Sequence, residues 1–302
     1  MFEQKCIYLQ KIFRAMKKLF LLVSLTLLFA SCSTSEYIKV ARNFSSQNDS
    51  LAVLVLRPDN ILYTNHKSYD DLKGLDDMSP KDREALLKSK SLFLSQYDDT
   101  LINRIFVDNL IGELGKTNLD VYTIEYLDEY NKCQEGKRFM VEIHQLEFDE
   151  YYDVVHDTYS EIKKNRMEGN DTLIYNKDTY INAFASNIWV DCFCPYGDTM
   201  SLLYATDRIT DYHDGWFAKD HYGEIIYYSE NDELTVEHID IFLKIVAKKY
   251  ANYLYDHILN GYVEHVHPEV VTYPKDMSLH YDFNTKNIEL VGENDRFVEI
   301  KR

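Results

Sequence analysis

The order of hydrophobic and polar positions predicts strands and helices from residue 51 onward. Residues 51–56 (LAVLVL) form an unbroken apolar run that ends at Arg57-Pro58, as is typical of a strand buried on both faces. Residues 98–114 repeat apolar side chains on one helical face, with Gly115 at the expected exit. Residues 235–260 carry the same spacing and predict the longest helix, which we expect Gly261 to end.

Further strands are predicted between the two long helices. Residues 119–127 and 138–148 have strand-like patterns, and the second changes face near Gln145, which indicates a β-bulge. The acidic, tyrosine-rich residues 149–178 allow that strand to continue, with a turn at 168–171. Residues 180–194 and 200–209 predict a hairpin across a turn at 195–198. Ser79-Pro80 with Glu84 predicts the start of a short helix, and the last forty residues are expected to be extended.

This order of elements predicts an α+β or α/β sandwich, with one mixed sheet and two helices on one face. The segments 51–56, 101–114, 119–127 and 138–148 together resemble a group of envelope folds. The group includes the amino-terminal domain of the TolB translocation protein, the curli secretion lipoprotein and the lipoprotein activators of penicillin-binding proteins. The resemblance covers residues 51–210. It implies action through protein–protein contact and carries over no catalytic residues.

The stretch 16–33 (MKKLFLLVSLTLLFASCS) has the order of a secretory signal: two lysines, about a dozen mainly apolar residues, then small residues. The apolar block is shorter than the roughly 20 residues needed to span a bilayer. Phe29-Ala30-Ser31-Cys32 resembles the lipobox of bacterial lipoproteins, with Phe29 in place of the usual leucine. The resemblance implies acylation of Cys32, with palmitate among the attached chains, and removal of residues 1–31. A buried amino-terminal helix with an incidental cysteine is the competing interpretation.

The position of this signal-like stretch sets the expected domain boundaries. Residues 1–15 add nothing that a signal needs, so both Met1 and Met16 are considered as the start. We expect residues 32–50 to form a polar tether, 51–265 a globular domain and 266–302 an extended carboxyl-terminal segment. No aspartate follows Cys32 directly, which favours the outer membrane. Whether the domain faces the periplasm or the cell surface is left open.

The net charge of the chain excludes some classes of binding partner. The formal net charge is −17, and residues 1–31 hold five basic residues and one acidic residue, so the expected mature chain is more acidic still. Such a balance argues against nucleic acid and against charge-driven binding to an anionic bilayer. The 25 tyrosines fit either strands and core or a binding surface.

Cysteine usage fits an exported protein, with Cys133, Cys192 and Cys194 remaining besides Cys6 and Cys32. Cys192 and Cys194 alternate on one strand face and are poor partners for each other. A disulfide from Cys133 to Cys192, one from Cys133 to Cys194, and three thiols are all considered. The C-F-C spacing matches no redox or zinc motif.

Two histidine groups raise the hypothesis of a metal site. His213 and His221 lie among aspartates, and His265 and His267 lie on one face of an expected strand or loop, with glutamates near. Solvated surface is the alternative for both groups. No nucleotide-binding, zinc-protease or serine-hydrolase motif is present, and we predict no cofactor.

Acidic and aromatic residues suggest two further surfaces. Asp149, Glu150, Asp153 and Asp157 lie near two tyrosines and resemble a carbohydrate-binding or acid–base surface, although carboxylates are dense throughout this chain. Trp189 is expected in the core, with a sugar platform as the alternative.

The sequence therefore supports two classes of function. One is a non-catalytic lipid-anchored envelope protein that is held at the membrane through Cys32 and binds another envelope protein. The other is an anchored hydrolase, or a protein that binds a glycan or small ligand through a carboxylate or metal site.

Overall fold

The computed structural model describes residues 38–46, 51–67, 74–165, 169–195, 199–266, 268, 277–292 and 296–300. Cys32, His267, residue 168 of the turn expected at 168–171, and residues 196–198 of the turn expected at 195–198 lie outside the described residues. Residues 169–171 belong to a strand rather than to the expected turn. The chain divides into two compact units. Unit 1 comprises residues 1–50 and 253–296, and unit 2 comprises residues 51–252 and 297–302.

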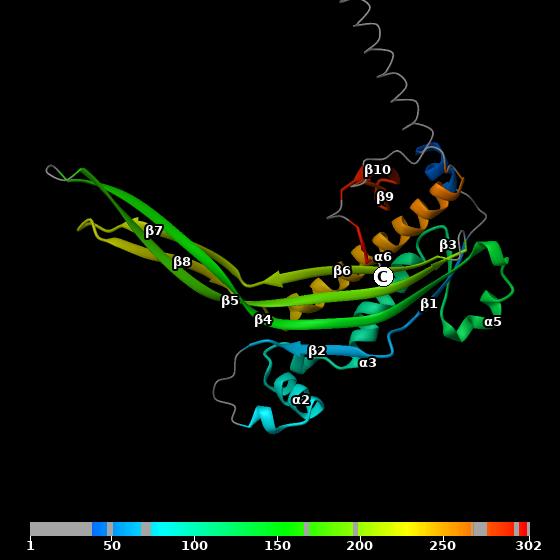
Figure 1. The fold of residues 1–302 in the computed structure, drawn as a ribbon, viewed down its shortest axis with the longest axis horizontal. Helices are drawn as coiled ribbons and strands as arrows, with labels where there is room; N and C mark the ends of the chain where they lie inside the picture. Colours follow the sequence, from blue (N-terminus) through cyan, green and yellow to red (C-terminus); the bar gives the residue numbers. More distant parts are fainter. Residues whose placement is uncertain are drawn as a thin grey trace, which may run out of the picture. The chain divides into compact units, whose positions relative to one another are not determined.

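A mixed sheet forms the centre of unit 2, and its strand order is β11-β6-β5-β4-β1-β3, with β2 also paired to β4 (Figure 1). The strands β1, β2, β3 and β4 are parallel where they pair, whereas β5, β6 and β11 add antiparallel neighbours. The strands of the sheet are β1 (Leu51–Leu56), β2 (Ile61–Asn65), β3 (Leu119–Tyr122), β4 (Arg138–Asn165), β5 (Gly169–Cys194), β6 (Thr199–Thr210) and β11 (Val298–Ile300). The expectation of a mixed sheet with helices is confirmed.

Local sequence explains where the helices begin. The hydroxyl of Ser79 accepts a hydrogen bond from the Asp82 N–H and Pro80 takes the first helical position, so α2 starts as expected. The helices of unit 2 are α2 (Pro80–Lys90), α3 (Asp99–Ile102), a π-helical turn η3 (Asn103–Val107), α4 (Asp108–Leu114), α5 (Leu127–Tyr130) and the first part of α6 (Val236–Val266); single 3₁₀ turns lie at η1 (Leu75–Asp77), η2 (Leu94–Gln96), η4 (Ile124–Tyr126) and η5 (Glu135–Lys137).

Aromatic side chains connect the helices to one face of the sheet. Phe106 of η3 and Phe148 of β4 are both fully buried and meet edge to face, with ring centroids 6.0 Å apart. Phe148 also stacks on Phe184 of β5, and Phe184 meets Phe242 of α6. Burying such large rings provides much of the hydrophobic stabilisation. The opposite face carries a smaller cluster near β1, which contains Ala52, Leu54, Tyr130, Tyr122, Leu127, Cys133 and Met140.

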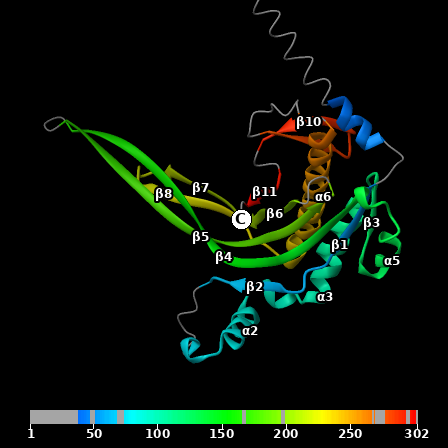
Figure 2. The ribbon, with the colours of Figure 1, turned by 45° about the vertical axis from the view of Figure 1, so that its right-hand side comes forward.

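The strands β4 and β5 are far longer than their neighbours, with 28 and 26 residues. At about 3.3 Å per residue, β4 spans roughly 90 Å. Only residues 138–150 of β4 pair with β1 or β2, and only residues 183–194 of β5 pair with β6. Residues 153–165 and 169–181 therefore continue as a two-stranded ribbon past the rest of the sheet (Figures 1 and 2).

A second hairpin, β7 (Tyr212–Lys219) with β8 (Ile225–Asp232), lies against this ribbon, as both ribbon views show. We call the ribbon (153–165 and 169–181) together with β7 and β8 the arm. The sequence patterns did not predict β7 and β8.

Unit 1 has its own aromatic packing. A helix over residues 38–46 presents Phe44 to Tyr255 and Tyr262, which lie in the part of α6 that belongs to this unit. The hairpin of β9 (Ser278–Asp282) and β10 (Asn287–Val291) is connected to α6 by Asn260, whose amide group donates to the Leu279 carbonyl (2.8 Å) and accepts from its N–H (3.0 Å).

Several element boundaries differ from those predicted. The predicted strand 119–127 ends at Tyr122 and turns into η4 and α5, and the strand β2 was missed. The helix α6 continues through Gly261 to Val266, because Leu259 and Val263 on its buried face are fully covered and this packing outweighs the low helix propensity of glycine. The predicted bulge is confirmed, since the register of β4 on β5 shifts between Ile143 and Gln145.

Candidate functional site

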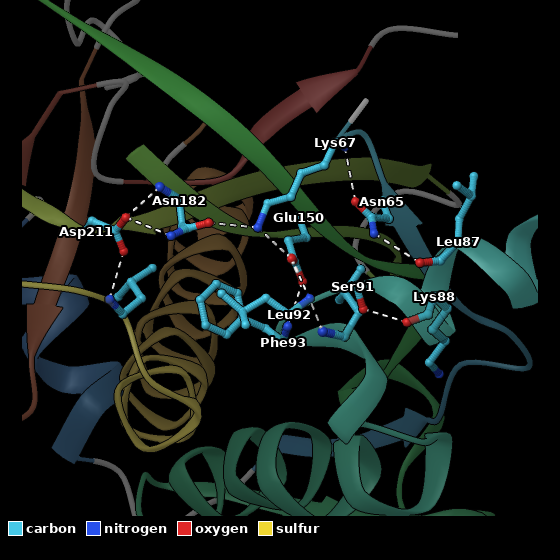
Figure 3. Close-up of polar contacts among 12 residues, drawn as sticks. Asn65, Lys67, Leu87, Lys88, Ser91, Leu92, Phe93, Glu150, Asn182 and Asp211 are labelled. Carbon is cyan, nitrogen blue, oxygen red and sulfur yellow. Dashed lines mark hydrogen bonds and ion pairs between the residues drawn. The ribbon is translucent and has the colours of Figure 1, made fainter. Parts of the chain in front are cut away.

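The root of the arm contains a buried carboxylate that is fully hydrogen-bonded. Glu150 of β4 has no exposed surface. Its Oε1 accepts from the Leu92 N–H (2.8 Å), and its Oε2 accepts from the N–H groups of Phe93 (2.8 Å) and Leu94 (3.1 Å) (Figure 3). These three amides lie at the start of η2, where the backbone donors of a helical turn would otherwise be unpaired. Glu150 therefore fixes this loop to the sheet.

Lys67 forms a buried ion pair with Glu150. Its ammonium group donates to the Glu150 carboxylate (2.7 Å) and to the Asn182 side-chain oxygen (2.8 Å), and its side chain is 5% exposed. The same nitrogen lies 4.8 Å from the ring centroid of Tyr152 and 5.4 Å from that of Phe93. A buried ion pair is tolerated when further polar groups satisfy both partners, as they do here.

Asn182 carries the network on to the start of β7. Its backbone N–H and its side-chain amide both donate to one carboxylate oxygen of Asp211, at 2.7 and 2.9 Å. The other Asp211 oxygen accepts from the Leu234 N–H (2.8 Å), just before α6. We call Asn65, Lys67, Glu150, Asn182 and Asp211 the root network; Asn65 belongs to it because its side chain accepts from the Lys67 N–H and donates to the Leu87 carbonyl (Figure 3).

The root network connects every element that meets where the arm leaves the sheet. It contains side chains from β4, β5, the end of β2 and the joint between β6 and β7. The hydrogen bonds described above join these side chains to one another and to the backbone of neighbouring elements, an arrangement that positions the arm. Cooperative buried networks of this kind make a local geometry unique.

A second polar cluster holds the β7–β8 hairpin on the ribbon. The Tyr227 hydroxyl donates to Asp157 (2.6 Å), and His213 Nε2 lies 2.9 Å from that hydroxyl and 3.2 Å from the Asp157 carboxylate. The hydrogen bond from Tyr227 lowers the pKa of Asp157, while burial raises the pKa of Tyr227. Gly215 lies directly beneath, and any side-chain carbon there would overlap the Tyr227 hydroxyl and the Asp157 carboxylate.

The hairpin presents its other side to solvent. Because side chains alternate along a strand, the register assigns one set of residues to this side. We call this set the outer face: Tyr212, Asp214, Trp216, Ala218, Ile226, Tyr228, Glu230 and Asp232. Trp216 and Tyr228 are each 42% exposed and stack on one another, with centroids 6.0 Å apart and an interplanar angle of 17°. Tyr212 is 58% exposed.

Within unit 2, the described candidate metal ligands His213 and His221 do not come together. His213 lies under the hairpin, while His221 is in the turn at the far end of β7, against Tyr222. His265 lies in the last turn of α6 rather than on the expected strand or loop, because this helix runs further than predicted. Within the described ranges, no group of three or more histidine, cysteine, aspartate or glutamate residues is arranged to hold a metal ion.

No disulfide joins the described cysteines Cys133, Cys192 and Cys194. Cys133 packs in the small cluster beside β1, whereas Cys192 points toward the opposite, helix-covered face of the sheet. The sheet therefore separates the sulfurs of the proposed Cys133 pairings. Burial raises the pKa of Cys192 to about 12, so this thiol is a structural one.

The acidic residues of β4 do not form one surface. Glu150 points toward the helices, whereas the three aspartates point to the other face because of strand alternation. Each aspartate has a different partner: Asp149 with Asn187 (2.6 Å), Asp153 with Arg208 (2.8 Å) and Asp157 with Tyr227 (2.6 Å). Trp189 was expected in the core, but it is only half-buried and packs against Tyr204 of the neighbouring strand.

Sequence inspection missed Lys67, Asn182 and Asp211. Lys67 lies in a stretch where no strand was predicted, and Asn182 lies within the predicted strand 180–194, so neither had a distinguishing pattern. Asp211 was considered only as one of the aspartates around His213. The one available signal was Glu150, a charged residue at an apolar-face position of the β4 alternation that contains Leu146 and Phe148. A carboxylate at such a position requires an internal partner.

Unit 1 contains a further buried carboxylate, Asp256, which accepts from the Tyr281 N–H (2.9 Å) and pairs with His280 Nδ1 (2.6 Å). The hydrogen bond to Asp256 raises the pKa of His280, and burial raises the pKa of Asp256. Both groups therefore bind protons more tightly in the folded state.

We accordingly expect the contribution of His280 to the stability of unit 1 to be fully present below the ordinary histidine pKa of about 6.5 and to be lost as pH rises through the raised pKa of His280. An NMR titration of the His280 ring should show a pKa above that of an unfolded histidine. Asp256→Asn should bring this pKa down toward the ordinary value. An unchanged His280 pKa in that variant would contradict the assignment.

Among the described residues, no helix is both long enough and apolar enough to cross a membrane. No protein-family model matches the chain, and no curated protein is similar to it at a significant level. One solved structure, a neuraminyllactose-binding hemagglutinin homolog from Helicobacter pylori, aligns over 73% of this chain and 91% of its own, with 8% identity and a TM-score of 0.30. At that TM-score the likeness carries no argument about fold or ligand.

Proposed function

We propose that this chain is a lipid-anchored, non-catalytic protein of the cell envelope that binds another envelope protein through the outer face of the arm. The proposal includes attachment to the outer membrane through Cys32 and a sheet with two helices on one face. Of the tether expected over residues 32–50, residues 38–46 instead form a helix that packs on α6 through the buried Phe44. The lipobox-like segment supports the anchor. The accessory role follows the expectation from sequence.

The observation that carries the proposal is the exposed Trp216–Tyr228 stack. Large aromatic side chains are enriched at protein–protein interfaces, where they supply contact area with little loss of conformational entropy. Here two such rings and Tyr212 share one face of a hairpin that the His213 cluster and the root network hold in place. A rigid element with exposed aromatic residues is suited to binding a partner without rearrangement.

Photo-crosslinking in intact cells tests the proposal. A photoreactive residue at Tyr212 should yield a discrete adduct, whereas one at Tyr126, which is 59% exposed but lies in η4, should not. Trp216→Ser should remove the adduct. Cys32→Ser should release the protein from the membrane fraction and weaken the adduct, because a di- or triacylated cysteine anchors a protein stably.

Two results would contradict the proposal. Equal adducts from both positions, or an adduct that survives Trp216→Ser, would show that the outer face is not the contact. A Cys32→Ser protein that still partitions with membranes would show that the anchor is not the lipid.

A further inference from the structure

We infer that the partner segment that binds the outer face is cationic, a strand or loop whose lysine or arginine side chains lie between the aromatic rings and the carboxylates. This inference rests on the proposed function, and it adds the chemistry of the partner. It is drawn from the arrangement of charges on β7 and β8.

The register places two carboxylates directly opposite one another. Asp214 pairs with Glu230, and Asp232 follows one rung further along the same face, opposite Tyr212. Like charges directly opposite on neighbouring strands repel and destabilise the pair. All three carboxylates are exposed. A cation placed between Asp214 and Glu230 would relieve this repulsion.

The part of the chain that the structure describes supplies no such cation. Lys219 pairs with Glu161, and Arg208 pairs with Asp153, so both cations bind carboxylates of the strand β4 rather than the outer face. Within the same residues, no ion pair reaches Asp214, Glu230 or Asp232. The negative charge of the outer face is therefore available to a partner.

The rung next to Asp214–Glu230 is the Trp216–Tyr228 stack. Aromatic faces attract lysine ammonium and especially arginine guanidinium groups, and the aliphatic stems of these residues pack well on apolar surface. Ala218 and Ile226 form the following rung and offer such a surface. Carboxylates beside aromatic rings thus match the two halves of a long basic side chain.

Other ligand classes fit less well. A divalent metal would need several converging ligands, and the described residues contain no such group. An anionic partner such as a nucleic acid would be repelled by the three carboxylates. Only a segment that carries both positive charge and apolar stems uses all of the outer face.

Fluorescence titration of the full chain tests the inference. The sequence contains two tryptophans, so a Trp189→Phe background leaves Trp216 as the single reporter. The probe is a short peptide that alternates arginine with valine, and its control carries glutamine in place of arginine. We expect the arginine peptide to change Trp216 emission, to bind at least about tenfold more tightly than the control, and to weaken as ionic strength rises.

Matched charge variants locate the effect. Asp214→Asn with Glu230→Gln should weaken binding of the arginine peptide by about tenfold. Asp76→Asn with Asp77→Asn removes the same two charges from the exposed turn η1 and should leave binding unchanged. Circular dichroism of each variant checks that the fold is retained.

Three outcomes would overturn the inference: equal binding of the glutamine peptide, equal loss in both charge variants, or a calcium-induced emission change that blocks the arginine peptide. Crosslinking from position 212 separates the two proposals. An adduct that is lost in Trp216→Ser but retained in the Asp214→Asn, Glu230→Gln variant would leave the proposed function standing and refute the cationic partner. An adduct retained in both would refute both.

Discussion

Replacing Glu150 by alanine is expected to destabilise unit 2 by about 3–5 kcal/mol. The substitution leaves the Lys67 ammonium group buried without its counter-ion. It also removes the acceptor for the N–H groups of Leu92, Phe93 and Leu94, of which the last two are buried. Buried donors that lose their acceptor cost free energy beyond the loss of the hydrogen bond itself.

Urea unfolding followed by circular dichroism measures this effect. The double variant Glu150→Leu with Lys67→Met should be less destabilised than Glu150→Ala, because replacing both members of a buried ion pair by apolar residues removes the unpaired charge. Asp108→Ala provides a matched control, since its ion pair with Arg57 (2.6 Å) is largely exposed. We expect it to cost less than about 1 kcal/mol. Equal losses for Glu150→Ala and Asp108→Ala would show that the root network contributes little.

Replacing Gly215 by alanine is expected to lift the β7–β8 hairpin from the ribbon, at a cost of about 1–3 kcal/mol. The added methyl group would overlap the Tyr227 hydroxyl and the Asp157 carboxylate, so either the hairpin or this hydrogen bond has to move. His213, whose side chain is 1% exposed, should then become accessible to solvent.

Hydrogen exchange of the β7 and β8 amides measures the change, and the loss of protection should be confined to the arm. Gly112→Ala is the matched control. It lies in α4 with nothing within 4 Å of an added carbon, so we expect it to be neutral or stabilising by up to about 1 kcal/mol. Unchanged protection in Gly215→Ala would contradict the close packing of the hairpin on Asp157 and Tyr227.

The sequence was sufficient for elements with a strong apolar pattern. The run 51–56 is a buried strand, Ser79-Pro80 does start a helix, and the change of face at Gln145 is a bulge. These predictions succeeded because each depends on burial or capping chemistry that acts within a few residues of the chain. The fold class followed from their order, as a mixed sheet with helices.

The continuation of the strand through residues 149–178 was anticipated, but the β7–β8 hairpin of the arm escaped prediction because its burial is unusual. In β7, the positions that face the ribbon include His213 and Gly215, and those that face solvent include Trp216 and Tyr212. Alternation of exposure is present, but each face mixes polar and apolar residues, with Phe217 toward the ribbon and Asp214 toward solvent, so the pattern of an ordinary half-buried strand is missing. The root network could not be found for a different reason: Lys67, Glu150 and Asp211 are far apart in sequence, and only the pairing of β2, β4 and β5 brings them together.

The great length of β4 and β5 has a consequence for how the chain reaches its native pairing. A slip of one residue between the strands would turn every following side chain to the wrong face. In the ribbon, apolar residues such as Ile162 and Ile174 are exposed, so burial resists such slippage only weakly there. Three features select the native alignment: the bulge at Ile143/Gln145, the buried Glu150, and the fit of Gly215 beneath Tyr227. The first two lie at the start of β4 and at the root of the arm, and the third holds the β7–β8 hairpin on Asp157, further along β4. A misaligned β4 would expose Phe148 or bury an unpaired charge. Correction of the strand register is therefore expected to be the slow step in the folding of unit 2.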